Sequence, residues 1–290
     1  MTTVAQAFAT FLNLSLTPTV NQQADIAAKV KATEGYLRKA FPSTSNLPLN
    51  RVALIGSAAR GTLIRPVNDV DVLAQFTNKD DIFETYRNDS VAFIGRVRTA
   101  LSAHTSVKQV GARGQAVRLF YVNGAHVDIA PLFKWSGGGY ALPSGDGRWI
   151  TTDPDTQADW FTNRTTTVGS SLPIIIKLLK RWNKVHSNRL ASYHLEVMVA
   201  TVFKTVGINH RDAVKCFFEW APTWIDVKDP AGHSGVLSTY LTQPIRQALL
   251  SRLAEALGRT RRALDAEAAG KHDEAKQLWR VELGDEFPSS

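Results

Sequence analysis

The chain has 290 residues, of which 44% are hydrophobic and 21% are charged. This balance is typical of a globular protein and excludes disordered and membrane-spanning classes. The formal net charge of +8 favours anionic partners such as nucleotides, nucleic acid or acidic lipid, without choosing among them.

The expected location is the cytoplasm, with no membrane partner. The longest apolar stretch, at 172–179, is interrupted by Lys177 and is shorter than the roughly 20 apolar residues of a transmembrane helix. The first residues lack the basic segment of a signal peptide. The single cysteine, Cys216, excludes an intramolecular disulfide and a cysteine-rich zinc cluster, which agrees with a reducing compartment.

The first half of the chain has the pattern of an α/β lobe. Apolar residues at helical spacing predict helices near 3–13 and 20–41. The short run RVALIG predicts a buried strand at 51–56, and DVDVLAQF predicts another at 69–76. Residues 80–103 again show helical periodicity.

A hairpin is the clearest local signal. The alternating segments AVRLFYV and AHVDIAPLF flank Asn123-Gly124, a dipeptide that supplies the positive φ angles of a type I′ turn. The following stretch, 134–155, is rich in Gly, Ser, Pro and Asp and is expected to be a linker or an active-site loop.

Helical patterns dominate after residue 150. We therefore expect a first lobe at 1–150, whose N-terminal helices are able to pack on the second, and a helical lobe at 151–290. Helices are predicted near 155–168, 171–187, 192–206, 210–219, 236–257 and 271–281.

Asp69 and Asp71 form the first candidate site. Side chains alternate along a strand, so these carboxylates share one side while Val70 and Val72 point to the core. Like charges this close repel each other, and a divalent cation between them makes the ionised pair favourable. Oxygen-only ligation suits Mg²⁺, which binds carboxylates together with water and phosphate oxygens.

Two further features extend this candidate site. Asp128 lies between Val127 and Ile129 on the return strand of the hairpin, so it faces away from their core side and is the third carboxylate. Gly56-Ser57 ends the first strand, where a glycine and a small hydroxyl allow close approach to a phosphate. Each feature alone is commonly a solvated edge or a turn, but their combination favours metal and phosphate binding.

The segments GSAARGTLIRPVNDVDVLAQF and HVDIAPLF resemble the active site of the polymerase-β-like nucleotidyltransferase superfamily. Within it, the chain resembles the bacterial cGAS/DncV-like nucleotidyltransferases, which make cyclic oligonucleotide signals. The narrower resemblance runs nearly the full chain and rests on GTLIRP, VDIAP, YALP, RWITTDP, KLLKRWN, SYHLEVMV and LWRVELGDEFP.

The resemblance implies an α/β (α+β) fold in which a nucleotidyltransferase lobe with a mixed sheet precedes a helical lobe, with the active site in the cleft. It implies that Asp69 and Asp71 bind two Mg²⁺ ions, for which Mn²⁺ is able to substitute. Asp128 would bind the ion that activates the attacking ribose hydroxyl. Gly56 and Ser57 would contact the donor triphosphate.

The resemblance also assigns residues of the helical lobe. Basic residues recur along one face of the helix predicted at 171–187, opposite an apolar face, and a solvated basic stripe is one interpretation of most of them. The resemblance singles out Lys180 as a triphosphate ligand and Ser192 as a second phosphate contact. Tyr193 is able to stack on a base, or to belong to the core.

The implied product is a cyclic di- or trinucleotide made from nucleoside triphosphates with release of pyrophosphate. It would be read by a separate effector in antiphage defence, and a nucleic acid or protein regulator is compatible with the basic charge. One alternative is transfer to an RNA tail or a small molecule, although no RNA-binding module is evident. Another is a catalytically silent RNA-binding protein, which the three intact carboxylates disfavour.

Overall fold

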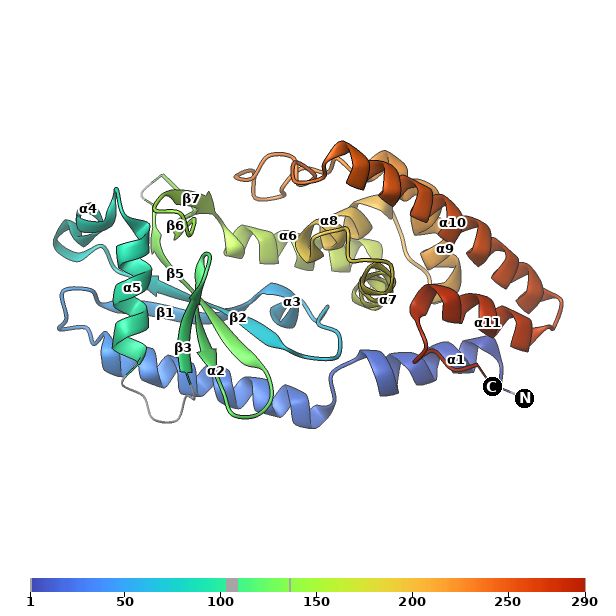
Figure 1. Cartoon of the computed structure of the whole chain (residues 1–290), viewed down its shortest axis with the longest axis horizontal. Helices are drawn as coiled ribbons and strands as arrows, with labels where there is room; N and C mark the ends of the chain where they lie inside the picture. Colours follow the sequence, from blue (N-terminus) through green and yellow to red (C-terminus); the bar gives the residue numbers. More distant parts are fainter. Residues whose placement is uncertain (1, 103–108, 136, 290) are drawn as a thin grey trace. The chain divides into compact units, whose positions relative to one another are not determined.

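The structure is a computed structural model that describes residues 2–102, 109–135 and 137–289. The chain folds into two compact units, which we call the sheet unit and the helical unit (Figure 1). The sheet unit comprises Thr19–Arg60 and Val67–Ala158. The helical unit comprises Met1–Pro18, Gly61–Pro66 and Asp159–Ser290.

The sheet unit contains a mixed sheet of seven strands in its described part, with the order β1-β2-β5-β4-β3 and with β6 and β7 continuing from β5. Strands β2 and β5 are parallel, and the other neighbours are antiparallel. The strands are β1 (Leu49–Ile55), β2 (Asp69–Phe76), β3 (Gln109–Arg113), β4 (Ala116–Phe120), β5 (His126–Lys134), β6 (Tyr140–Pro143) and β7 (Trp149–Thr152).

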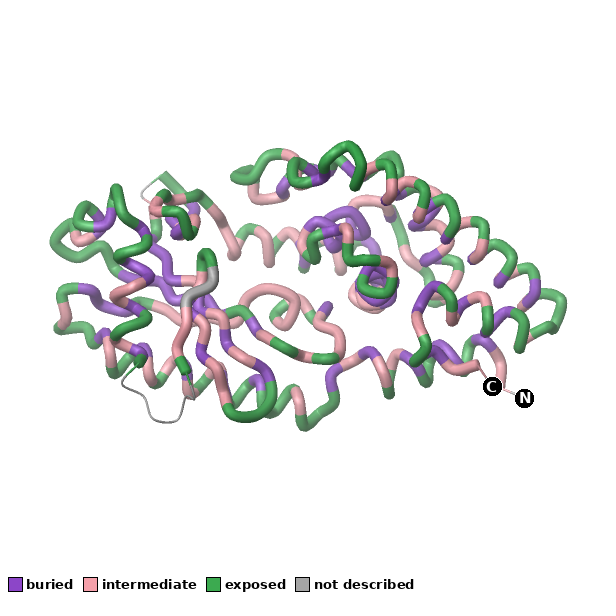
Figure 2. Tube along the Cα trace, in the orientation of Figure 1, coloured by how far each residue is buried: buried purple, intermediate pink, exposed green. Residues whose placement is uncertain are grey.

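Helices pack on the apolar face of this sheet. Phe76 of β2 contacts Phe41, which follows α2, and Phe93 of α5, so the face that also carries Val70 and Val72 is buried. Figure 2 shows the buried stretches along β2 and β5. The helical segments of the unit are α2 (Val20–Ala40), α3 (Gly56–Ala59), a 3₁₀ helix (Lys79–Asp81), α4 (Ile82–Tyr86) and α5 (Ser90–Leu101).

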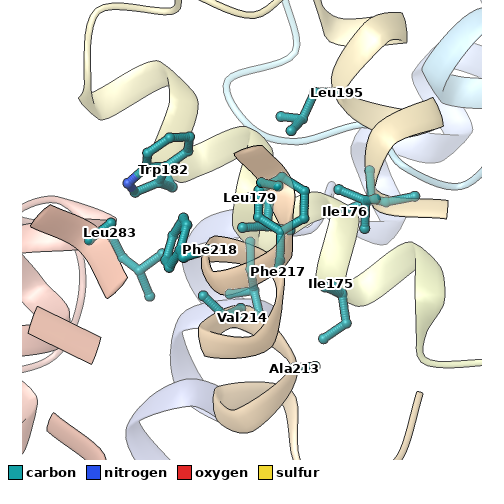
Figure 3. Packing of buried hydrophobic residues seen from close by; sticks show 14 of the residues in the cluster. Ile175, Ile176, Leu179, Trp182, Leu195, Ala213, Val214, Phe217, Phe218 and Leu283 are labelled. Carbon is teal, nitrogen blue, oxygen red and sulfur yellow. The ribbon is translucent and has the colours of Figure 1, made fainter. Parts of the chain in front are cut away.

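The helical unit is organised around α7. Ile176, Leu179 and Trp182 of this helix are buried against Phe217 and Phe218 of α9 (Figure 3). Its segments are α1 (Val4–Thr10), a π-helix (Phe11–Leu16), α6 (Pro154–Val168, which begins in the sheet unit), α7 (Leu172–Val185), α8 (Ser192–Val202), α9 (His210–Trp220), a 3₁₀ helix (Ala221–Trp224), α10 (Gln243–Ala268) and α11 (His272–Leu283).

Residues near both ends of the described chain belong to the core of the helical unit. The Phe8 ring of α1 contacts Trp279 of α11, with 4.9 Å between ring centroids, and Phe287 beyond α11, at 5.0 Å. The closing motif LWRVELGDEFP thus supplies apolar anchors for the first helix. None of the helices in the described part of the chain is long and apolar enough to cross a membrane.

The single helix predicted at 80–103 is wrong in one respect, since α4 and α5 are separate helices and residue 103 lies outside the described part. The break occurs because the Asp89 side chain accepts a hydrogen bond from Ala92 N at 3.0 Å and caps α5. A side-chain acceptor at this position starts a helix and does not continue one.

The predicted hairpin is present, but its predicted type I′ turn is wrong. Residues 121–125 connect β4 to β5, and only Gly124 of the Asn-Gly pair has a positive φ, at 72°. The Asn123 carbonyl accepts a hydrogen bond from Lys29 Nζ of α2, so a contact from a distant helix shapes the loop. A local dipeptide preference cannot anticipate that contact.

Three strands and several helix boundaries also differ from prediction: α8 ends at Val202 instead of near 206, and α10 ends at Ala268 instead of near 257. The stretch 134–155 contains β6 and β7 and is not wholly loop, and β3 was not expected. Both β6 and β7 are four residues long, which is too short for a clear alternation. Helix α10 starts at Gln243 instead of near 236, because Thr242 is extended and Pro244 lies in the first turn.

We expect Phe93→Ala to lower the free energy of unfolding by about 3–5 kcal/mol, because it removes a fully buried ring from an aromatic cluster. The ring centroid of Phe93 lies 4.7 Å from Phe133 and 5.5 Å from Trp149. Denaturant unfolding followed by circular dichroism measures the change. The matched control is Val91→Ala on the exposed side of the same helix, which should change stability by about 0.5 kcal/mol or less. Equal losses of stability in the two variants would contradict the assignment of Phe93 to the buried aromatic cluster.

Candidate active site

Three charged side chains form a row across three adjacent strands. Asp71 of β2 is in register with Asp128 of β5, and Asp128 is in register with Arg118 of β4. Asp69 precedes Asp71 by two residues and shares its face, as strand alternation predicts. The register of the sheet therefore brings together the three carboxylates that the sequence selected.

Gly56 and Ser57 lie directly beside this row. Strand pairing sets Ile55, the last residue of β1, opposite Asp71, and Gly56-Ser57 begins the short α3 immediately afterwards. Gly56 has a φ of +67°, and a Cβ added there would overlap the Asp71 carboxylate. A glycine is therefore required both by the backbone conformation and by the close approach of Asp71.

Arg118 is the residue of this site that the sequence analysis missed. Its Nε donates to Asp128 Oδ1 at 2.6 Å, and its Nη2 donates to Asp128 Oδ2 and to Asp69 Oδ2, the latter at 3.0 Å. Its side chain is only 12% exposed. The alternation of AVRLFYV held the signal, because Val117 and Leu119 are core residues and Arg118 must then face the carboxylates.

Burial and crowded negative charge both act on Asp71. Desolvation by the surrounding chain, followed by repulsion from Asp69 and Asp128, raises the pKa of Asp71 from 3.8 to about 6. Asp71 nevertheless remains an exposed residue, so ions reach it from solvent. Hydrogen bonds to Asp128 raise the pKa of the Arg118 guanidinium, which therefore stays charged.

The donor set has the chemistry of a divalent-cation site. It contains only carboxylate oxygens, which are the ligands that hard divalent cations prefer. As the side chains now stand, no group of three or more His, Cys, Asp or Glu residues in the described ranges is arranged to hold a metal ion. Asp69 and Asp128 are instead paired with Arg118. The three residues supply oxygen ligands of the kind that suits a divalent cation, and Asp128 is in register with Asp71 on the neighbouring strand.

The remaining predicted residues belong to the helical unit. Lys180 of α7 is buried and forms an ion pair with Glu196 of α8. Thr62 joins this pair: its hydroxyl donates to Glu196 Oε1 at 3.0 Å, and its carbonyl accepts from Lys180 Nζ at 3.2 Å. The alternative interpretation, a solvated basic stripe, therefore does not hold at Lys180 or at the neighbouring Arg181, which is also buried.

Ser192 and Tyr193 begin α8. Ser192 is exposed, whereas Tyr193 is partly buried and packs against the core of the helical unit. The Tyr193 hydroxyl donates to Asp229 Oδ1 at 3.1 Å. These contacts favour the interpretation of Tyr193 as a core residue. Its hydroxyl is hydrogen-bonded to the loop that carries Asp229.

The raised pKa of Asp71 predicts a pH dependence of stability in the metal-free protein. Between about pH 4 and pH 6 the folded form keeps a proton that the unfolded form releases, so the free energy of unfolding falls as pH rises through this window. Asp71→Asn removes this contribution. Urea unfolding in EDTA should therefore show the variant gaining stability relative to the parent from about pH 4 to pH 6. Asp80→Asn, an exposed aspartate of the same unit, is the control. A pH-independent difference between parent and Asp71→Asn would contradict the prediction.

Lys180→Met is expected to destabilise the protein by about 3–5 kcal/mol, because it leaves Glu196 as a buried carboxylate without its cation. Adding Glu196→Gln should restore much of the loss, since the uncompensated charge is then gone. Urea unfolding of the two single variants and the double variant measures this coupling. Lys184→Met, at an exposed position of the same helix, serves as control. Additive losses in the double variant would show that the two charges do not act as a pair.

Comparison with known proteins gives relatives over most of the chain. A family model described as the Second Messenger Oligonucleotide or Dinucleotide Synthetase domain matches residues 1–164, more than half of the chain. The probable cyclic nucleotide synthase of Bacillus cereus (strain VD146) is 26% identical over an alignment of 269 positions, and the match covers 81% of this chain and 81% of that protein.

Solved structures agree on the fold. CdnC of E. coli MS115-1, solved with ATP, matches with a TM-score of 0.80 at 18% identity and covers 98% of both chains. CdnC has also been solved in complex with HORMA-deltaN. The Vibrio cholerae DncV cyclic AMP-GMP synthase matches with a TM-score of 0.77 at 15% identity, covering 98% of this chain and 96% of DncV. The predicted fold, a mixed sheet followed by helices, is confirmed. The chain belongs to the Second Messenger Oligonucleotide or Dinucleotide Synthetase family and is a nucleotidyltransferase of the bacterial cGAS/DncV-like type.

Proposed function

We propose that this cyclic oligonucleotide synthase joins nucleoside triphosphates into a cyclic di- or trinucleotide and releases pyrophosphate at each step. The observation that carries the proposal is the row of Asp69, Asp71 and Asp128 beside Gly56-Ser57. Family membership and the similarity to a probable cyclic nucleotide synthase support the same chemistry.

In each step a ribose hydroxyl attacks the α-phosphorus of a triphosphate while the bond from that phosphorus to the pyrophosphate oxygen breaks in line. Divalent cations, when bound, lower the pKa of the attacking hydroxyl and stabilise charge on the attacking and leaving oxygens. Asp69 and Asp71 would hold two Mg²⁺ ions, or Mn²⁺ in their place. Asp128 would hold the ion next to the attacking hydroxyl.

The chain's own groups position the triphosphate. The missing side chain of Gly56 leaves room for close approach, and the Ser57 hydroxyl is proposed to contact the donor phosphates. Ser192 is proposed as a second phosphate contact, for which its exposure is suitable. Tyr193 remains a proposed base contact, through its ring, since its hydroxyl is bonded to Asp229.

The contacts of Lys180 favour an indirect role in binding the triphosphate, whereas the sequence suggested a direct phosphate contact. Its ammonium is shared between Glu196 and Thr62, so it is not a freely solvated charge. Thr62 lies in Gly61–Pro66, the segment that follows α3 and Ser57 in the chain. We therefore assign Lys180 a role in holding this segment for the donor triphosphate, with Glu196 orienting the ammonium.

The product would be read by a separate effector in antiphage defence, and the location is proposed to be cytoplasmic. The complex of CdnC with HORMA-deltaN makes a protein regulator a natural proposal here, and the net charge of +8 allows a nucleic acid in that role. The alternative is transfer to another acceptor, such as RNA or a small molecule. The product assay must distinguish this reaction from ring closure.

The proposed function predicts that the parent enzyme, given nucleoside triphosphates with Mg²⁺ or Mn²⁺, makes a product that resists phosphatase because it has no terminal phosphate. Its mass should equal that of its nucleoside monophosphates less one water for each bond formed. The double variant Asp69→Asn with Asp71→Asn should make no product yet keep its fold, because losing two carboxylates removes repulsion. Mass spectrometry and circular dichroism measure the two results.

The outcomes separate the parts of this proposal. Unchanged product formation by the double variant would refute the metal assignment. Linear, phosphatase-sensitive oligomers or extension of an added RNA would refute ring closure and leave nucleotidyl transfer standing.

A further inference from the structure

Asp128 occupies the middle of the charged row, with a potential partner on each side. Asp71 precedes it on β2 and Arg118 follows it on β4, and all three are in register. Neighbouring strands lie about 4.8 Å apart, so a short carboxylate in the middle reaches either side but turns toward only one. In this structure both Asp128 oxygens accept hydrogen bonds from Arg118.

Arg118 is held in place from several directions. Its guanidinium lies 5.9 Å from the centre of the Phe120 ring, and that ring packs at a tilt of 59° against His126, with 4.8 Å between centroids. Gly111 is opposite Arg118 on β3, and a Cβ there would stand only 3.0 Å from the Phe120 ring. Because the Arg118 guanidinium is packed against the Phe120 ring, a cation held between Asp71 and Asp128 requires Asp128 to turn away from Arg118.

The charges explain why an arginine stands here. Three carboxylates on one face repel one another, and Arg118 contacts two of them with a planar fork that suits carboxylate oxygens. It supplies between Asp69 and Asp128 the positive charge that a divalent ion would otherwise supply. The pairing also explains why no metal-ready group of carboxylates exists among the described residues.

We propose that Arg118 is an internal counter-cation of the metal-free enzyme. It holds Asp69 and Asp128 until a divalent cation binds, and Asp128 then turns from Arg118 to the ion. The proposal rests on the metal assignment of the proposed function. It has a functional consequence: an ion alone must compete with Arg118 for Asp128, so the nucleotide-free enzyme binds metal weakly. A triphosphate adds its own oxygen ligands, so metal and substrate load together.

The test measures Mn²⁺ binding to nucleotide-free protein by electron paramagnetic resonance. Arg118→Met removes the competing charge and should tighten Mn²⁺ binding about tenfold, because a unit charge a few ångströms from the ion is lost. Arg38→Met removes one positive charge from the same unit, at an exposed pair with Glu34, and should change affinity by less than about twofold. Unchanged or weaker binding by Arg118→Met, relative to this control, overturns the proposal, since it would mean that Arg118 orients Asp128 for the metal.

Two further variants keep the test decisive. If Arg118→Met does not fold, Arg118→Lys keeps a charge but loses the two-pronged contact, and it should still tighten Mn²⁺ binding, by about threefold. Unchanged or weaker binding by this variant also overturns the proposal. Asp128→Asn separates the two hypotheses: it should weaken Mn²⁺ binding if the proposed metal site is right. Parent-like binding by Asp128→Asn refutes the metal assignment itself, whatever Arg118 does.

Discussion

Repulsion among three carboxylates on one face of a sheet is the constraint on which the rest of the site depends. Asp69, Asp71 and Asp128 are brought together by the parallel pairing of β2 with β5, and an arrangement of like charges persists only with a compensating cation. In the metal-free protein Arg118 forms ion pairs with Asp69 and Asp128. The pKa of Asp71 is raised by desolvation and then by repulsion from these two carboxylates. The site is thus prepared for positive charge before any ligand binds.

The opposite face of the sheet keeps the carboxylates in this arrangement. Val70 and Val72 alternate with the aspartates of β2, and Val127 and Ile129 alternate with Asp128, so a shift of one residue in either strand would bury charge and expose apolar side chains. The aromatic cluster around Phe93 and its helix makes that face dense. Register at the active site is therefore set by apolar packing on the other side.

The helical unit buries charged side chains in its core. Helix α7 carries basic residues at helical spacing, yet Lys180 and Arg181 are buried. Glu196 of α8 neutralises Lys180, and Thr62 from a segment more than a hundred residues earlier in the chain completes the hydrogen bonds. Periodicity reports which residues share a face of α7, but the partners that make burial favourable come from other elements.

The sequence by itself determined the fold class, the side-chain faces of β2 and β5 and the three carboxylates beside Gly56-Ser57, because strand alternation and backbone demands on glycine are local properties. Only the tertiary structure decided what depends on contacts between distant segments. It paired Arg118 with Asp128 through strand register, bent the loop after β4 around Lys29, and joined Gly61–Pro66 to the helical unit. These outcomes depend on partners far away in the chain, for which a local pattern carries no signal.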